Sequence, residues 1–157
     1  MTVDATEFLV RTHETGIRIK KLHEDAVIPK YQTHGSVGFD FHTVEDLVLK
    51  PGESTLVRTG LVIATPPGYM LALTPRSSTF KKWGLIMPNS IGVIDQDYSG
   101  DEDEVKIPVL NLSSAFAKVE KGERIAQGIF ISVARLTFTE CDSMGDSRGG
   151  FGSTGTR

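Results

Sequence analysis

Short β-branched and alternating apolar runs, closed by turns rich in glycine and proline, recur along this chain. The clearest turns are KPGE at residues 50–53, TPPG at 65–68 and EKGE at 120–123. Turns spaced by roughly 8–12 residues are typical of a β-sandwich or β-barrel. We therefore predict strands over residues 17–22, 38–43, 46–49, 55–64, 69–74, 91–94, 105–112 and 124–136.

No internal repeat or linker divides the 157 residues, so we predict a single all-β domain over residues 16–144. A short helical turn is expected only over 113–119 and after Arg76. Residues 1–15 are expected to be loosely ordered. Residues 145–157 are rich in glycine and cannot pack a core, so we expect them to be flexible, or ordered by a ligand or a neighbouring chain.

The composition limits the classes of partner. A net charge of −3 argues against a surface that binds nucleic acid, although a local pocket can still be positive and bind a small anion. Cys141, the single cysteine, cannot form an internal disulfide, which favours a reducing compartment. The sequence has no apolar run of about 18 residues and no signal-peptide pattern. We expect a cytoplasmic protein, or one of the host cytosol or nucleus if a virus encodes it, that binds neither nucleic acid nor membrane.

The stretch IGVIDQDYSGDEDEVK, residues 91–106, places a carboxylate directly after an apolar strand. Asp95 is then at the border of desolvation, where a base can be oriented and tuned. The ordinary alternative is a turn aspartate that accepts hydrogen bonds from backbone N–H groups. Tyr98 would in that case be a half-buried hairpin aromatic. The residues alone leave both interpretations open.

Two further segments offer groups that suit phosphate oxygens. TPRSST, residues 74–79, combines the charge of Arg76 with two hydroxyls and free backbone N–H groups, although an ordinary polar turn is the alternative. RGGFGSTG, residues 148–155, has glycines that allow a close approach to a ligand and hydroxyls that can donate; a flexible tail is the alternative. The four histidines and the cysteine show no metal-ligand spacing, so no zinc site is predicted.

Five segments in one order resemble the motifs of the trimeric dUTPase family, the dUTP nucleotidohydrolases. They are SVGFDF, TPRSS, NSIGVIDQDYSG, GERIAQGIF and RGGFGSTG, and the resemblance extends over about residues 16–155. It implies a jelly-roll-like all-β fold and a homotrimer with active sites between subunits. It also implies hydrolysis of dUTP to dUMP and pyrophosphate with Mg²⁺, which limits uracil incorporation into DNA and supplies dUMP for thymidylate synthesis.

The resemblance assigns roles to the third motif. Asp95 corresponds to the general base that orients and deprotonates the water attacking the α-phosphorus. Tyr98 corresponds to the residue packed against the deoxyribose, where it leaves no room for a 2′-hydroxyl. The hairpin reads the uracil edge and excludes the methyl group of thymine, with contacts from Asn89, Gly92, Val93 and Ile94.

The other motifs are implied to manage the charge of the triphosphate. Ser77 and Ser78 hold phosphates, Arg76 is an anchor paired with Asp40, and Gln127 lies beside the α-phosphate. Mg²⁺ is held mainly by the phosphates and water, and Asp40 reaches it through water. The tail forms a lid in which Phe151 stacks on the uracil. The remaining lid contacts are implied for Arg148, Gly152, Ser153 and Thr154.

The chain departs from the family pattern in the strand after Gly100, which is longer and more acidic. We expect residues 101–104 to form a solvated bulge pointing away from the site. Arg148 is also closer in sequence to Phe151 than is usual, and Gly128 replaces an aliphatic residue.

Two alternatives remain. A dCTP deaminase shares the fold and the Arg-Ser-Ser turn and would use a glutamate such as Glu102 or Glu104, but Asp97-Tyr98 and the tail favour the diphosphatase. A non-catalytic nucleotide sensor or regulator is the other, and the intact Asp95 argues against it.

Overall fold

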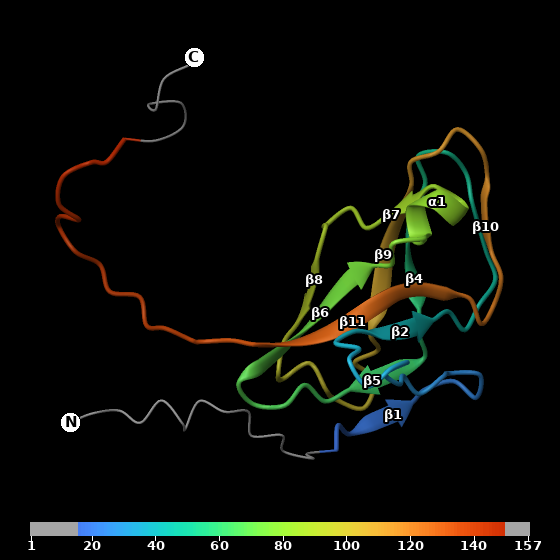
Figure 1. Cartoon of the computed structure of the whole chain (residues 1–157), viewed down its shortest axis with the longest axis horizontal. Helices are drawn as coiled ribbons and strands as arrows, with labels where there is room; N and C mark the ends of the chain where they lie inside the picture. The colour runs from blue at the N-terminus through green and yellow to red at the C-terminus, as the bar shows by residue number, and fades with distance from the viewer. Residues whose placement is uncertain (1–15, 150–157) are drawn as a thin grey trace.

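The chain is built almost entirely of short antiparallel strands, as Figure 1 shows for the computed structural model, which describes residues 16–149. In chain order the elements are β1 (Ile19–Lys21), β2 (Phe39–His42), β3 (Leu47–Leu49), β4 (Ser54–Arg58), β5 (Leu61–Ile63), β6 (Tyr69–Pro75), α1 (Thr79–Trp83), β7 (Leu85–Ile86), β8 (Gly92–Ile94), β9 (Lys106–Asn111), β10 (Ala117–Val119) and β11 (Arg124–Ser132).

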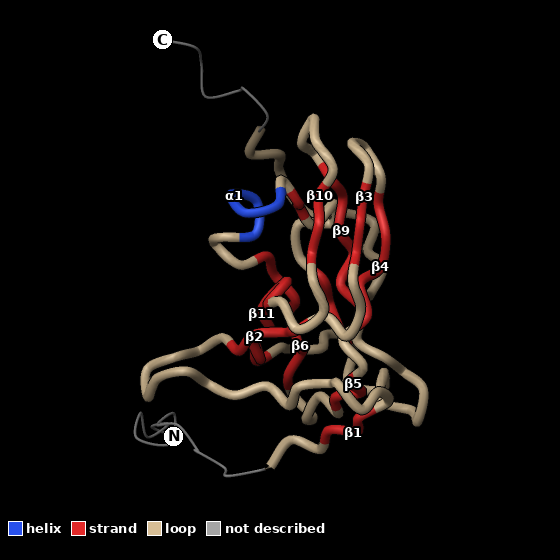
Figure 2. Tube along the Cα trace, turned by 90° about the vertical axis from the view of Figure 1, so that its right-hand side faces the viewer, coloured by secondary structure: helices blue, strands red, loops and turns tan. Residues whose placement is uncertain are grey.

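The strands form four small sheets. The largest has the order β2-β11-β6-β8, and β4-β9-β7 forms a second sheet. Strands β1 and β5 pair with each other, as do β10 and β3. Figure 2 shows β3, β4, β9 and β10 running side by side above the level of β1 and β5. Strand β8 is an edge strand, because among the described residues it pairs only with β6.

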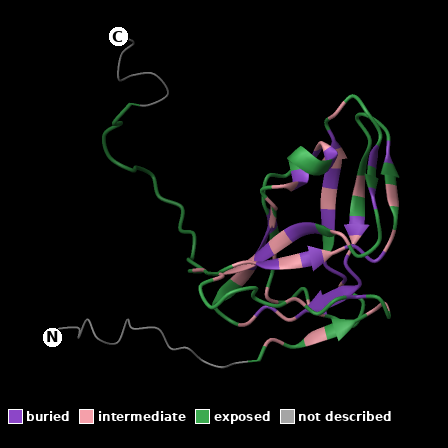
Figure 3. Ribbon diagram, turned by 45° about the vertical axis from the view of Figure 1, so that its right-hand side comes forward, coloured by how far each residue is buried: buried purple, intermediate pink, exposed green. Residues whose placement is uncertain are grey.

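The core lies between the sheets and follows the alternation of the sequence. In β2, Phe39 and Phe41 are buried while Asp40 and His42 face the other side, as the period of two requires. Figure 3 shows the buried residues concentrated on the strands and the exposed ones on the turns. The largest fully buried side chains include Phe41, Leu61, Ile63, Leu71, Leu73, Leu85, Ile107 and Ile125.

Glycine at position 128 makes room for an aromatic cluster. The rings of Phe39 and Phe41 meet edge to face at 5.5 Å between centroids, and Phe130 packs on Phe39 at the same separation. A Cβ atom at Gly128 would lie 2.7 Å from a ring carbon of Phe39 and of Phe41. The aromatic side chains of β2 therefore occupy the space that an aliphatic side chain at position 128 would need.

Every predicted strand is present, although β11 ends at Ser132 rather than at residue 136, and β7 and β10 were not predicted. The run over 55–64 is divided into β4 and β5, because Gly60 has a φ of +66° that a continuous strand cannot contain. The helical turn predicted after Arg76 is confirmed by α1, but the one over 113–119 is wrong. The Asn111 side-chain amide donates to the carbonyls of Leu49 and Ala115, and the chain then enters β10.

No helix among residues 16–149 is long and apolar enough to cross a membrane.

Candidate active site

Asp95 lies at the end of the edge strand β8. Gly92 is buried against Leu73 of β6, where an added Cβ would come within 3.0 Å of the leucine Cβ. Ile94 pairs with Leu71, so Asp95 follows beside Met70 at the start of β6. The apolar strand therefore carries an exposed carboxylate to the sheet edge.

A tight, solvent-exposed turn precedes β8. The backbone N–H of Ser90 donates to the carbonyl of Met87 at 3.0 Å, and Ser90 has a φ of +59°. Asn89 and Val93 are exposed to solvent, Val93 to 54%. The turn and strand together present polar backbone groups and an apolar side chain along one open edge.

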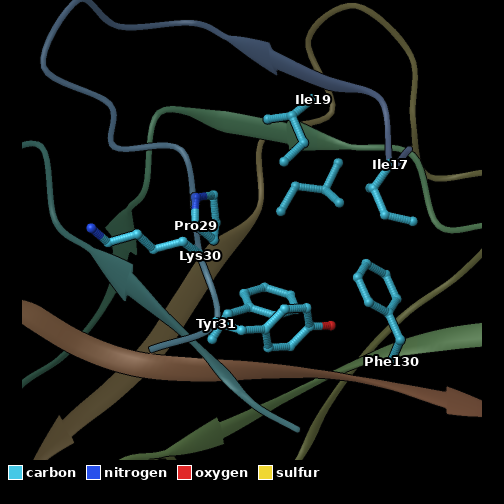
Figure 4. Close-up of a pocket in the computed structure, with 8 residues that line it drawn as sticks. Ile17, Ile19, Pro29, Lys30, Tyr31 and Phe130 are labelled. Atoms are coloured by element: carbon cyan, nitrogen blue, oxygen red, sulfur yellow. The ribbon is translucent and has the colours of Figure 1, made fainter. Parts of the chain in front are cut away.

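An open hollow of about 580 Å³ lies beside this edge. It combines apolar walls with acidic groups, and its lining residues are Tyr69, Met70, Val93, Asp95, Gln96, Asp97, Val133 and Arg135. A second, smaller groove of about 100 Å³ lies away from Asp95 (Figure 4). Ile17, Ile19, Pro29 and Phe130 give it apolar walls, and none of its lining residues is an acid that could act as a base.

A cluster of charges forms at the opposite end of β6. The Asp40 carboxylate accepts hydrogen bonds from Arg76 Nε at 2.7 Å and from Arg124 Nη1 at 3.1 Å, one on each oxygen. Arg76 Nη1 also donates to Ser78 Oγ and to the Arg124 carbonyl. The expected pair between Arg76 and Asp40 is present. Because both carboxylate oxygens are engaged, the cluster has a fixed geometry with a surplus of positive charge.

Two residues of this cluster were missed by the sequence analysis. Arg124 lies in the quoted GERIAQGIF segment, and the pairing of β11 with β2 is the signal that places it beside Asp40. His42 lies opposite Arg124 in the same ladder, and its Nδ1 is buried without a hydrogen-bond partner. Burial lowers the pKa of His42, Asp40 opposes the shift, and both arginines add to it.

Gln127 joins the same cluster. It lies on β11 between Asp40 of β2 and Thr74 of β6, and its Nε2 donates to the Pro75 carbonyl at 3.1 Å. Ser77 is exposed beside it, on the turn that precedes α1. Asp40, Arg76, Ser78 and Gln127 are therefore brought together, and Ser77 lies next to Arg76 in the chain.

The structure does not bring this cluster to Asp95 within one chain. Asp95 lies beside Met70, and Arg76 is six positions further along, so the two ends are separated by on the order of 20 Å at about 3.3 Å per residue. One copy of the chain thus presents two incomplete halves of a site.

The acidic segment after Gly100 differs from the expectation. Asp101 and Glu102 are exposed, and Lys20 Nζ binds the Asp101 carboxylate at 2.9 Å. The prediction of a wholly solvated bulge is wrong for Glu104, which is only 6% exposed. Its burial is possible because Arg58 Nε and the Gly60 N–H both donate to its carboxylate.

The chain after β11 forms an extended arm, residues 133–149, which Figure 1 shows leaving the body of the domain. Large apolar side chains on the arm are exposed, to 79% at Leu136, 99% at Phe138 and 92% at Met144. Arg148 is exposed near its end. The other predicted lid residues, Phe151, Gly152, Ser153 and Thr154, lie outside the described residues.

Comparison with known proteins decides the family. The family profile described as dUTPase matches residues 24–155. The chain is 43% identical over 142 residues to the deoxyuridine 5′-triphosphate nucleotidohydrolase of Helicobacter pylori strain J99, covering 88% of this chain and 96% of that protein. The chain belongs to the dUTPase family. The protein of the same name from Nautilia profundicola is 41% identical over 142 residues, with 88% and 98% covered.

Solved dUTPase structures share the fold. The dUTPase of Staphylococcus bacteriophage 80alpha with dUPNHPP superposes with a TM-score of 0.79 at 24% identity, covering 90% of this chain and 99% of that one. A mutant dUTPase of phage phi11, whose structure concerns the coordination of a structural Mg(II) ion, gives 0.72 at 21% identity, covering 82% and 98%. The predicted jelly-roll-like all-β dUTPase fold is confirmed.

Proposed function

We propose that this dUTPase-family protein hydrolyses dUTP to dUMP and pyrophosphate by water attack on the α-phosphorus. The observation that carries the proposal is the exposed Asp95 carboxylate, delivered by the edge strand β8 to the rim of the hollow, with Tyr98 on the loop that follows. Among the described residues Asp95 forms no ion pair, so its oxygens are available to a water molecule. A general base needs this geometry before anything else.

The edge strand supplies base recognition. The backbone groups of β8 that do not face β6 are free to pair with the polar edge of uracil, as an added strand would. Asn89, Gly92, Val93 and Ile94 form this reading edge. A base with a different donor pattern would leave buried polar groups unpaired, which strongly disfavours it.

The separation of the two half-sites supports a homotrimer with shared active sites. A reacting phosphate must lie within about 3 Å of both the base and the groups that stabilise its charge. Asp95 and the Asp40–Arg76 cluster are too far apart in one chain to do so. We therefore infer that Asp95 of one subunit faces Arg76, Ser77, Ser78 and Gln127 of another, with the third copy closing the ring.

The arm supplies the third part of the site. Its exposed Leu136 and Phe138 make it suited to pack on a neighbouring subunit rather than on its own. That placement would carry Arg148 and the lid residues beyond it, Phe151, Gly152, Ser153 and Thr154, towards a neighbouring site. Stacking of Phe151 on uracil would contribute about 1–3 kcal/mol.

Mg²⁺ fits the residues present if the substrate supplies most of its ligands. No three acids, histidines or cysteines among residues 16–149 come together as a metal cage. Each Asp40 oxygen accepts one hydrogen bond from an arginine and can accept another. Asp40 could therefore bind a water molecule that coordinates the ion. When bound, the ion neutralises phosphate charge. Arg76, Ser77 and Ser78 then orient the triphosphate.

The alternatives fit the structure less well. A deaminase would need a catalytic glutamate at the site, but Glu104 is buried against Arg58, and Glu102 does not line the hollow beside Asp95. A non-catalytic sensor would not need an available carboxylate at position 95. The single cysteine, Cys141, is free, which supports a cytoplasmic location as part of this proposal.

The deciding experiment is to incubate the protein with dUTP, dCTP or dTTP and measure pyrophosphate and ammonia. Pyrophosphate released from dUTP alone supports the proposal. Ammonia from dCTP would identify a deaminase, and binding without either product would identify a sensor.

A further inference from the structure

Tyr98, on the loop after β8, is held by the backbone of Glu104, a buried acid to which the family motifs assign no role. Tyr98 Oη donates a hydrogen bond to the backbone carbonyl of Glu104 at 3.1 Å, while its side chain remains 40% exposed. The ring is therefore held from its hydroxyl end and open to a ligand on its side. The position of the Glu104 carbonyl sets where the ring can lie.

That carbonyl belongs to one of the most firmly anchored residues of the loop. The Glu104 carboxylate accepts from Arg58 Nε at 3.1 and 3.3 Å and from the Gly60 N–H at 2.8 Å. Lys106 Nζ lies 4.0 Å away. A buried carboxylate is costly unless it is paired and hydrogen-bonded, so these contacts permit little displacement.

The next residue is tied to the same turn. The Val105 N–H donates to the Leu61 carbonyl at 2.8 Å, and Thr59 Oγ1 donates to the Val105 carbonyl at 2.6 Å. Gly60 is closely packed, since a Cβ there would meet three neighbouring side chains at 2.9–3.0 Å. The connection between β4 and β5 is thus a rigid platform beneath the loop.

We propose that Glu104 is a positioning residue for Tyr98. Its carboxylate, locked by Arg58 and the Gly60 N–H, holds the carbonyl that receives the tyrosine hydroxyl and so fixes the ring that separates deoxyribose from ribose. The inference deepens the proposed function and rests on it. It also explains why the chain turns back after its exposed acids, with the Gly100 N–H bonded to Asp103 Oδ2, and enters the core at Glu104.

The test compares dUTP with UTP as substrates of the full-length protein. Tyr98→Phe removes the hydroxyl, and Glu104→Gln removes the charge while keeping the shape. Each should lower the ratio of kcat/KM for dUTP to that for UTP about five- to tenfold, as loss of one hydrogen bond predicts. The double variant should lose no more than either single variant, because both changes release the same ring. Glu102→Gln, an exposed neighbour, should leave the ratio unchanged.

The inference is overturned if Glu104→Gln keeps the wild-type ratio, or if the two losses multiply in the double variant. A purely structural role would lower the melting temperature without changing the ratio. Should Glu104→Gln not fold, Arg58→Lys removes the paired Nε contact at a more exposed position and must lower the ratio in the same way. Wild-type protein that releases no pyrophosphate from dUTP would instead refute the proposed function, and the two failures are distinct.

Discussion

Two inactive variants should restore activity to each other when they share a trimer. Asp95→Asn removes the base from one half-site, and Gln127→Ala removes an amide from the other. The two halves lie on the order of 20 Å apart within one chain, so each complete site must combine residues of two subunits. In randomly mixed trimers a site is intact when its Asp95 comes from the Gln127→Ala chain and its Gln127 from the Asp95→Asn chain. About one quarter of the sites meet both conditions.

The assay unfolds the two variants together at equal concentration, refolds them, and measures pyrophosphate release from dUTP per subunit. The refolded population should reach about a quarter of the wild-type rate, whereas each variant alone stays near zero. Native mass spectrometry of chains carrying tags of different mass confirms the mixing. If mixed trimers form and remain as inactive as their parents, the site lies within one subunit and the reasoning is wrong. A monomeric wild-type protein would refute it earlier.

Four further outcomes follow. Asp95→Asn should lower kcat about 10²–10⁴-fold while dUTP binding by calorimetry is retained; unchanged turnover would remove it as the base. Deleting residues 145–157 should leave a folded trimer by sedimentation with little activity, and full activity would end the lid hypothesis. Gly128→Ala should cost about 1–3 kcal/mol of unfolding free energy in denaturant titrations, because the added Cβ overpacks two phenylalanine rings; Gly35→Ala, at an exposed site with open space and no positive φ, is the control for the loss of a glycine. The pKa of His42 is lowered in the folded chain, so the unfolded chain binds a proton more readily. The free energy of unfolding should therefore keep its full value above pH 6.5, the ordinary pKa of histidine, and fall as the pH drops below it. His42→Gln should flatten that fall, and an unchanged slope would assign it to other groups.

Local pattern was sufficient for most of the strands, because alternation and turn chemistry act over neighbouring residues, whereas the pairing of Arg76 with Asp40 came from the resemblance to the family motifs. Local pattern did not predict features that depend on contacts between residues far apart in the sequence. Glu104 appeared to be one of several solvated acids, and only Arg58, on a strand far earlier in the chain, makes its burial possible. Arg124 was overlooked for the same reason, since its partner is set by the register of β11 on β2.

The same limit applies to the site. Motif order indicated which residues act together, but not that Asp95 and Arg76 lie at opposite ends of one strand. That arrangement arises from sheet topology, which no local pattern reports. The lid residues beyond Gly149 remain a prediction.

On the proposed assembly, the extended arm makes catalytic output depend on protein concentration. Phe138 is 99% exposed on a single chain, so a subunit that needs a second molecule to cover it would be unfinished at low abundance. Dilution should then lower the specific activity as well as the amount of enzyme, so output rises more steeply than gene dosage when expression is weak. A cell or virus that expressed only traces of this chain would therefore obtain little enzymatic activity from it.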